Sequence, residues 1–316
     1  MYFDESKSVI KSISNDLISN KFELHLSSEI LGAGSYACVF RGQVSVSCRQ
    51  VAIKYIKKTE NKADENDDPS SSLLNEIMIL KNLNHRNIVQ FIDYADDYNN
   101  IYLVMELCIA GDLEKMLCLR RKLHEHESKY LAAQLFKVLL FLHNKKIIHG
   151  DIKPANIMLQ VRGGCENINI VNNKAFRSPL GLIVKLCDFG TSRELIDSEA
   201  TPNSEQKLNP LDFINFEILG TEGYLSPEQI KEENLTSAID MWALGVVLYR
   251  CLTGYLPYRP SASCLVDPDL KYNAALWNNI SQECISCTKL LLEIDHIKRG
   301  TALQVMSHPW VDEIWL

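Results

Sequence analysis

The pattern of apolar residues changes once along this chain, near Asp112, and this change limits the possible folds more than any other feature. Before it, "FELHLSSEILGAG", "YACVFRGQVSVSC" and "QVAIKYIK" alternate apolar and polar residues, as half-buried strands do. After it, "LEKMLCLRRKLHEHESKYLAAQLFKVLLFLHNKK" and "SAIDMWALGVVLYRCLTG" follow the helical repeat over long stretches. The sequence therefore predicts a bilobal α+β fold. Its small lobe is an antiparallel β-rich unit with one main helix, and its larger lobe is mostly helical.

The expected small lobe also contains "NIVQFIDYADDYNNIYLVMEL", which reads as two strands joined by a polar turn. Its one helix is expected over "LLNEIMILKNLN", with the serine run before it supplying the N-cap. The hinge between the lobes is expected at residues 106–112. A cleft between two such lobes is a usual place for a ligand.

Composition excludes several classes of protein. The chain has 316 residues, of which 46% are hydrophobic, and a net charge of −7, which argues against a nucleic-acid binder with an overall basic field. No apolar run reaches the roughly 18 residues that a membrane span needs, and the first twenty residues lack the pattern of a secretory signal. We therefore expect a monomer in the cytoplasm, or alternatively the nucleus, without membrane or nucleic-acid partners.

The ten cysteines are expected to be free thiols in a reducing compartment. Cys284 and Cys287 have the C-x-x-C spacing of half a zinc site, but no second pair completes four ligands. They lie in the helix-like stretch "SQECISCTKLLLEI", so we expect two packed helical thiols.

Three features of the expected small lobe are suited to binding phosphate. In "LGAGSYACVF" the glycines Gly32 and Gly34 let a hairpin backbone approach a ligand closely, although Ala37 stands where a third glycine would complete G-x-G-x-x-G. "VAIK" places Lys54 in a strand, where an inward-facing ammonium would need a carboxylate partner. Glu76 is the candidate because it lies within the apolar stripe of the next helix.

The larger lobe contains a loop and a strand end suited to phosphoryl transfer. In "HGDIKPAN", Asp151 can accept a hydroxyl proton, Lys153 can neutralise a phosphoryl group, and Asn156 can offer an oxygen to a divalent cation. "VKLCDFGTS" ends a strand-like run at Asp188, a carboxylate of the kind that holds Mg²⁺ over a polyphosphate.

These motifs, in this order and spacing, resemble those of the eukaryotic-type protein kinase domain. The resemblance covers residues 22–310, with an N-lobe at 22–107 and a C-lobe at 108–310. It leaves an N-terminal extension at 1–21 and a tail at 311–316. "HGDIKPAN" resembles the serine/threonine type through Lys153, but Gly150 replaces the arginine of many relatives, making this a non-RD variant.

The resemblance implies ATP and Mg²⁺ as cofactors, protein substrates, and a role for each matching residue. The nucleotide phosphates would be covered by Leu31, Gly32, Ala33, Gly34, Ser35, Tyr36, Ala37, Cys38 and Val39. The adenine and ribose would be bound by Val39, Ala52, Met105, Glu106, Cys108, Asp112 and Met158, with Met105 as gatekeeper. Phosphoryl transfer would use Lys54 paired with Glu76, Asp151 as base, Lys153 on the γ-phosphate, and Asn156 and Asp188 on Mg²⁺.

Further matches imply structural contacts. Thr221 in "GTEGYLSPE" would bond Asp151 and Lys153, Glu228 would pair with Arg299, and Asp240 would brace the catalytic-loop backbone. Ser226 replaces the usual alanine before Pro227.

Other parts of the sequence depart from the family pattern. The segments from Asn156 to Asp188 and from Asp188 to Glu228 are long, and Ser198, Thr201 and Ser204 are conceivable phosphosites. The missing arginine predicts activation that does not depend strongly on a phosphorylated loop. Asp112, near the mouth of the expected cleft, suggests a preference for substrates with basic residues N-terminal to the phosphorylated residue.

Two rival interpretations remain. The first is a pseudokinase-like binding or scaffold protein on the same fold, which would be favoured by loss of Lys54, Asp151 or Asp188. The second is a kinase of small molecules or lipids, against which the peptide-binding form of "GTEGYLSPE" argues.

Overall fold

The computed structural model describes residues 24–33, 37–44, 47–58, 69–96, 98, 100–161, 179–195, 220–231, 235–258 and 274–312. The chain divides into two compact units. Unit 1 runs to Asn84 and includes Val89–Ile109, and unit 2 contains His85–Ile88 and everything from Ala110 onward.

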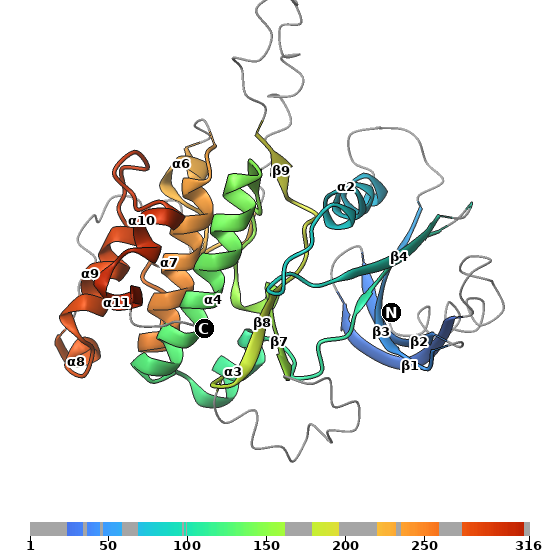
Figure 1. Ribbon diagram of the computed structural model, residues 1–316, viewed down its shortest axis with the longest axis horizontal. Coiled ribbons are helices and arrows are strands. Elements are labelled where there is room, and N and C mark those ends of the chain that lie inside the picture. The colour runs from blue at the N-terminus through green and yellow to red at the C-terminus, as the bar shows by residue number, and fades with distance from the viewer. Residues whose placement is uncertain are drawn as a thin grey trace, which may run out of the picture. The chain divides into compact units, whose positions relative to one another are not determined.

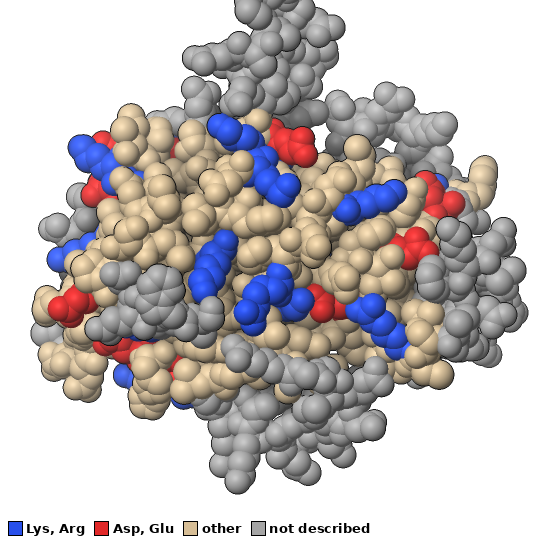
Figure 2. All heavy atoms as spheres, viewed as in Figure 1, with Lys and Arg blue, Asp and Glu red and all other residues tan. Residues whose placement is uncertain are grey.

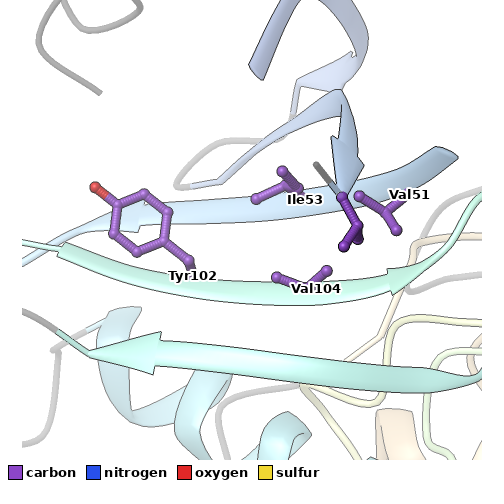
Figure 3. Packing of buried hydrophobic residues seen from close by; sticks show 5 residues of the cluster. Val51, Ile53, Tyr102 and Val104 are labelled. Atoms are coloured by element: carbon purple, nitrogen blue, oxygen red, sulfur yellow. The ribbon is translucent and has the colours of Figure 1, made fainter. Parts of the chain in front are cut away.

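Unit 1 is built on a five-stranded antiparallel sheet in the order β1-β2-β3-β5-β4 (Figure 1). Its strands are β1 (Leu24–Ala33), β2 (Cys38–Val44), β3 (Gln50–Lys57), β4 (Phe91–Asp96) and β5 (Asn100–Glu106). Val51 and Ile53 of β3 lie beside Tyr102 and Val104 of β5 in a buried cluster that Val44 completes (Figure 3). The strands fall where alternating, β-branched sequence predicted them.

The helix of unit 1 is α2 (Pro69–Lys81), which packs on β3, β4 and β5. Leu73, Glu76, Ile77 and Leu80 are buried along one stripe at helical spacing. The serine run was predicted to cap this helix, and that prediction was wrong because the helix begins before the serines. It starts at Pro69, whose fixed φ suits the first turn of a helix.

Unit 2 is mostly helical, as predicted, with two short antiparallel ladders. β7 (Ile157–Val161) pairs with β8 (Leu182–Leu186), and β6 (Ile147–Ile148) pairs with β9 (Arg193–Glu194). This first pair lies in the long segment between Asn156 and Asp188, of which residues 162–178 lie outside the described residues. The helices and the short 3₁₀ turn η1 are α3 (Leu113–Arg120), α4 (Glu125–Asn144), η1 (Pro154–Asn156), α6 (Pro227–Ile230), α7 (Ala238–Thr253), α8 (Ala274–Trp277), α9 (Gln282–Leu291), α10 (Ala302–Met306) and α11 (Pro309–Asp312).

The stretch predicted as one long helix after Asp112 is two helices, α3 and α4. The break falls at Arg121, which has a left-handed backbone (φ 67°), and α4 restarts after the extended residue His124. The backbone N–H of His124 donates to Glu127 (2.9 Å) and so closes the new N-terminus.

α7 lies at the centre of unit 2 and contacts both α4 and α9 (Figure 1). Almost every residue of α7 is buried, which explains why its sequence is apolar nearly all round. It ends at Gly254, whose left-handed backbone (φ 81°) would bring a side chain to within 2.9 Å of the Arg121 carbonyl oxygen. No helix in the described ranges is both long enough and apolar enough to cross a membrane.

Candidate active site

In unit 1, the predicted pairing of Lys54 with Glu76 is confirmed. The Lys54 ammonium lies 2.6 Å from Glu76 Oε2, and their side chains are 15% and 1% exposed. β3 holds the lysine and α2 holds the glutamate. A buried carboxylate is costly without a cation, so this pair ties α2 to the sheet through an ammonium suited to phosphate.

The same face of the sheet carries more of the residues predicted to bind the nucleotide. Val39 is directly opposite Lys54, and Ala52 is directly opposite Met105. Directly opposite residues of an antiparallel pair share a face, as do residues two apart on one strand. β2, β3 and β5 therefore present Val39, Lys54, Ala52 and Met105 together, whereas Cys38 points to the other face.

The predicted phosphate loop is described in part. Leu31, Gly32 and Ala33 end β1, and Cys38 and Val39 begin β2 directly after Ala37, so the predicted hairpin is confirmed. Gly34, Ser35 and Tyr36 lie outside the described residues. At the end of unit 1, the side chain of Glu106 has a structural partner, because it accepts a hydrogen bond from Gln90 N–H (2.7 Å). Cys108, two residues later, is buried.

In unit 2, Asp240 of α7 holds the backbone of the loop that contains Asp151, as predicted. Its carboxylate accepts from the backbone N–H groups of His149 (3.0 Å) and Gly150 (2.9 Å), and from His143 (2.9 Å). Burial on its own raises the pKa of Asp240. The hydrogen bond with His143 and the charges of His143 and His149 outweigh burial, so the net effect is a lowered pKa. The loop backbone is therefore fixed by an ionised carboxylate inside the core.

The reactive end of the loop is a cluster of three side chains. Thr221 Oγ1 donates to Asp151 Oδ1 (2.8 Å), Lys153 Nζ donates to Thr221 Oγ1 (2.5 Å), and Lys153 Nζ lies 2.7 Å from Asp151 Oδ2. This confirms the predicted contacts of Thr221. Asp151 is held as a buried carboxylate that accepts a hydrogen bond from a hydroxyl, and an acceptor within such reach is what general-base chemistry on a hydroxyl requires. A small hollow beside Asp151 is also lined by Thr221, Tyr224 and Leu225.

Asn156 and Asp188 fit a hard divalent cation. The Asn156 amide nitrogen donates to the backbone oxygen of Asp151 (2.9 Å) and to its Oδ2 (3.0 Å). Both partners are acceptors, so the amide oxygen must be the other terminal atom of Asn156. Cys187 N–H donates to the Asn156 carbonyl (3.0 Å), which brings the following Asp188 next to it. One amide oxygen and one carboxylate form the kind of donor set that Mg²⁺ accepts together with phosphate and water.

The backbone of Asp188 is left-handed (φ 65°), which is uncommon for a residue other than glycine. The fully buried Phe189 follows, and its ring meets that of His149 edge-on at 4.9 Å. These neighbours hold Asp188 in a sparsely populated conformation of the kind that often occurs at functional sites.

Asp112 and Met158 are brought together by a bridge between their backbones in unit 2. Asp112 is also the N-cap of α3: its Oδ1 accepts from Lys115 N–H (2.7 Å), and Lys115 Nζ lies 3.1 Å from Oδ2. Because Lys115 neutralises Asp112, the carboxylate gives little support to a preference for basic substrates.

The remaining predicted contacts are structural. Glu228 and Arg299 form a buried ion pair (2.5 Å), which confirms their predicted pairing, and Ser226 caps α6. Cys284 and Cys287 are free and buried in α9, as predicted, and burial raises the pKa of Cys287 to about 12. Across the described ranges, no cluster of His, Cys, Asp and Glu is arranged to hold a metal. The conceivable phosphosites Ser198, Thr201 and Ser204 lie outside the described residues.

Sequence reasoning missed several residues that position this site. Thr191 and Ser192 both donate from their hydroxyls to the His149 carbonyl (3.0 and 3.1 Å), whereas Asp240 accepts from the His149 N–H. Their place directly after "DFG" was the available signal. His143 gave no such signal because it resembles any histidine in the last turn of a helix.

A second missed group holds Tyr224. Arg250 of α7 donates to the Tyr224 hydroxyl (2.6 Å) and forms a two-pronged pair with Glu114 of α3 (2.5 and 2.6 Å). Burial, as the leading cause, raises the pKa of Tyr224. The segment that carries Thr221 is thereby tied to two helices.

Known proteins share this sequence over nearly its full length. Human serine/threonine-protein kinase ULK3 is 32% identical over 291 residues, which is 90% of this chain and 54% of the human protein. Mouse serine/threonine-protein kinase DCLK3 is 30% identical over 94% of this chain and 34% of its own. For rat serine/threonine-protein kinase D2 the values are 29%, 96% and 32%. The chain thus spans about half or less of each of these relatives.

The family comparison agrees with the geometry. The description of the protein kinase domain matches residues 26–311, which include the Lys54–Glu76 pair, the Asp151 loop and Asp188. The fold, a β-rich unit followed by a mostly helical one, is the one that the motifs predicted. This chain belongs to the protein kinase domain family.

Proposed function

We propose that this protein is a serine/threonine protein kinase, which transfers the γ-phosphate of ATP to Ser and Thr hydroxyls of protein substrates. The observation that carries the proposal is the cluster of Asp151, Lys153 and Thr221, in which an acceptor, a cation and a hydroxyl lie within 2.5–2.8 Å of one another. The similarity to three serine/threonine kinases supports the same activity.

The residues divide the work as follows. Asp151 orients the substrate hydroxyl and accepts its proton, while Lys153 offsets the negative charge of the phosphoryl group as it moves. Lys54, held by Glu76, binds the α- and β-phosphates, which remain on the nucleotide after the γ-phosphate is transferred. Asn156 and Asp188 would hold Mg²⁺, which when bound supplies positive charge over the phosphate oxygens. Catalysis rests on positioning and charge.

The remaining predicted residues would bind the nucleotide. We propose that the hairpin of residues 31–39 covers the phosphates, and that Ala52, Met105, Cys108 and Met158 contact the base. For the residues in unit 1, this assignment is supported by the register of β2, β3 and β5, which places them on one face of the sheet.

Asp151→Asn tests the proposal, because the amide keeps the size of the carboxylate but cannot accept the proton. We expect the phosphorylation rate of a generic substrate such as myelin basic protein to fall about 10²- to 10⁴-fold. Phosphoamino-acid analysis of the labelled product should show phosphoserine and phosphothreonine. Mainly phosphotyrosine would refute the Ser/Thr assignment, and absence of ATP consumption by the wild type would favour the pseudokinase alternative.

We also propose that activity does not require a phosphorylated activation loop, as in kinases of the non-RD type. Gly150 offers no side chain to a phosphate. Its backbone is left-handed (φ 82°), and a Cβ at this position would lie 3.1 Å from the Thr191 carbonyl oxygen, which is a tight contact. Phosphatase-treated protein should keep most of its kcat/KM. Loss of nearly all activity, restored by loop phosphorylation, would contradict this proposal.

We propose the cytoplasm, with the nucleus as the alternative, as the site of action, because ten cysteines suit a reducing compartment. Imaging of the tagged full-length protein tests this.

A further inference from the structure

A group of basic side chains lies on unit 2, apart from the proposed active site. Lys137 and Phe141 of α4 and Lys145, which caps the C-terminus of that helix, follow one another at four-residue spacing, so they lie on one side of the helix. Beside them lie His85 and Arg86, from the short segment of unit 2 that precedes β4, and Lys185 of β8. We call these six residues the α4 basic surface.

The contacts within this surface are direct. The rings of His85 and Phe141 stack with centroids 4.8 Å apart, and the Lys145 ammonium lies 5.5 Å from the Phe141 centroid. Lys185 Nζ lies 3.5 Å from the carbonyl oxygen of Ile88, and the N–H of Ile88 donates to the His85 carbonyl (3.0 Å). Lys145 therefore lies over one ring of a two-ring platform, and Arg86, Lys185 and Lys137 lie near enough to its other ring, His85, to act on it electrostatically.

The charges on this surface act on one another. Burial and then the positive charges of Arg86, Lys185 and Lys137 lower the pKa of His85, and no carboxylate is among the causes. Within the described residues, neither Arg86 nor Lys145 forms an ion pair with an acid, and both are exposed. Figure 2 shows Lys and Arg side chains spaced along the face over α4, with Asp and Glu sparse between them.

This arrangement is unusual for a chain whose net charge is −7. Like charges brought together repel, and an anion lying between them would relieve that repulsion. The local charge is therefore complementary to a negatively charged ligand.

We propose that the α4 basic surface docks an acidic peptide segment of a partner protein. Eight residues separate Lys137 from Lys145, which is about 12 Å along a helix, a distance that about four residues of an extended peptide cover. The His85–Phe141 platform gives the side chains of such a peptide an apolar contact. A nucleic acid or an anionic membrane extends beyond this surface and meets the net negative charge of the rest of the chain, whereas a short acidic peptide contacts the basic residues alone.

The test uses the full-length protein and a fluorescently labelled short poly-glutamate peptide, with binding measured by fluorescence anisotropy. The double variant R86E/K145E should weaken binding about tenfold or more. The matched control is K57E/K122E, which reverses two other exposed cations and changes the net charge equally. It should bind like the wild type. Binding should fall as salt rises from about 50 to about 500 mM.

A second readout locates the ligand. In NMR titrations of the histidine ring protons, saturation with the peptide should raise the pKa of His85, because bound carboxylates offset the neighbouring cations. Thermal unfolding checks that R86E/K145E folds like the wild type.

Three results would overturn the proposal. One is equal weakening in the two double variants, which would mean a response to net charge alone. Another is a pKa of His85 that does not change when the peptide saturates the protein. The third is tighter binding of an oligothymidine of equal charge, or of phosphatidylserine vesicles, which would assign the surface to a nucleic acid or a membrane.

Discussion

At the scale of single residues, the loop that contains Asp151 depends on side chains that are far away from it in sequence. Asp240 bonds the backbone of residues 91 and 90 positions earlier, and Thr221 bonds Asp151 across 70 positions. Each replaces water that the loop would otherwise bind.

Thr221→Val should lower kcat about 10- to 100-fold, because it removes a hydroxyl that bonds two charged groups, each such bond contributing roughly 1.5–3 kcal/mol. Thr221→Ser keeps the hydroxyl and serves as the control, with kcat near the wild-type value. Steady-state kinetics with a peptide substrate measure both. Equal kcat for the valine and serine variants would show that the hydroxyl does not position Asp151.

Asp240→Asn should lower the free energy of unfolding by about 3 kcal/mol at neutral pH, since it weakens a buried charge network. The folded pKa of Asp240 lies below its usual value of 3.8, so its stabilisation is present above that pH and is lost as the pH falls through the folded pKa. The stability gap between variant and wild type should therefore narrow below about pH 4. Denaturant unfolding at several pH values measures it, and a constant gap would contradict the assignment.

At the scale of elements, a buried amide network joins the segment His85–Ile88 to α4 and β8. Asn87 Nδ2 donates to Gln134 Oε1 (3.1 Å) and to the Val184 carbonyl (2.8 Å), and Val184 N–H also donates to Gln134 Oε1 (3.1 Å). This explains why four residues flanked by unit 1 belong to unit 2. It also holds the segment that supplies His85 and Arg86 to the α4 basic surface.

Gln134→Leu should therefore cost about 2–3 kcal/mol of unfolding free energy, because Val184 N–H loses its partner inside the core. Gln282→Leu, on the exposed first turn of α9, is the control and should change stability little. Chemical denaturation of both variants compares them. If the two lose the same stability, the amide network is not a stabilising contact.

At the scale of the whole molecule, the Glu228–Arg299 pair connects the segment after Thr221 to the chain just before α10. The two side chains are 1% and 0% exposed, and Arg299 also donates to the Ala238 carbonyl at the start of α7 (2.9 Å). One guanidinium thus joins three parts of unit 2.

Glu228→Gln should destabilise unit 2 by about 3–5 kcal/mol, because it leaves a buried guanidinium without its counter-charge. Hydrogen exchange should rise in α7 and α9, which pack on each other, more than in the strands of unit 1. Lys298→Gln, in an exposed pair with Asp295, is the control and should have little effect. An equal increase in hydrogen exchange in both units would show that the ion pair does not act within unit 2 alone.

The sequence by itself determined the strands of unit 1 and the main helices of unit 2, and it selected Asp151, Lys153, Asn156 and Asp188 as candidate site residues. Alternation and helical spacing are local patterns set by backbone geometry, and the motifs are contiguous. The break between α3 and α4 was missed because only the left-handed backbone of Arg121 ends the helical pattern, and its composition gives no sign of it.

Only the tertiary structure decided which distant side chains meet. His143, Thr191, Ser192 and Arg250 hold the site, and His85, Arg86, Lys137, Lys145 and Lys185 form one charged surface from three separate segments. The physical reason is that such contacts depend on how helices and strands pack, and the spacing of residues along the chain does not record that packing.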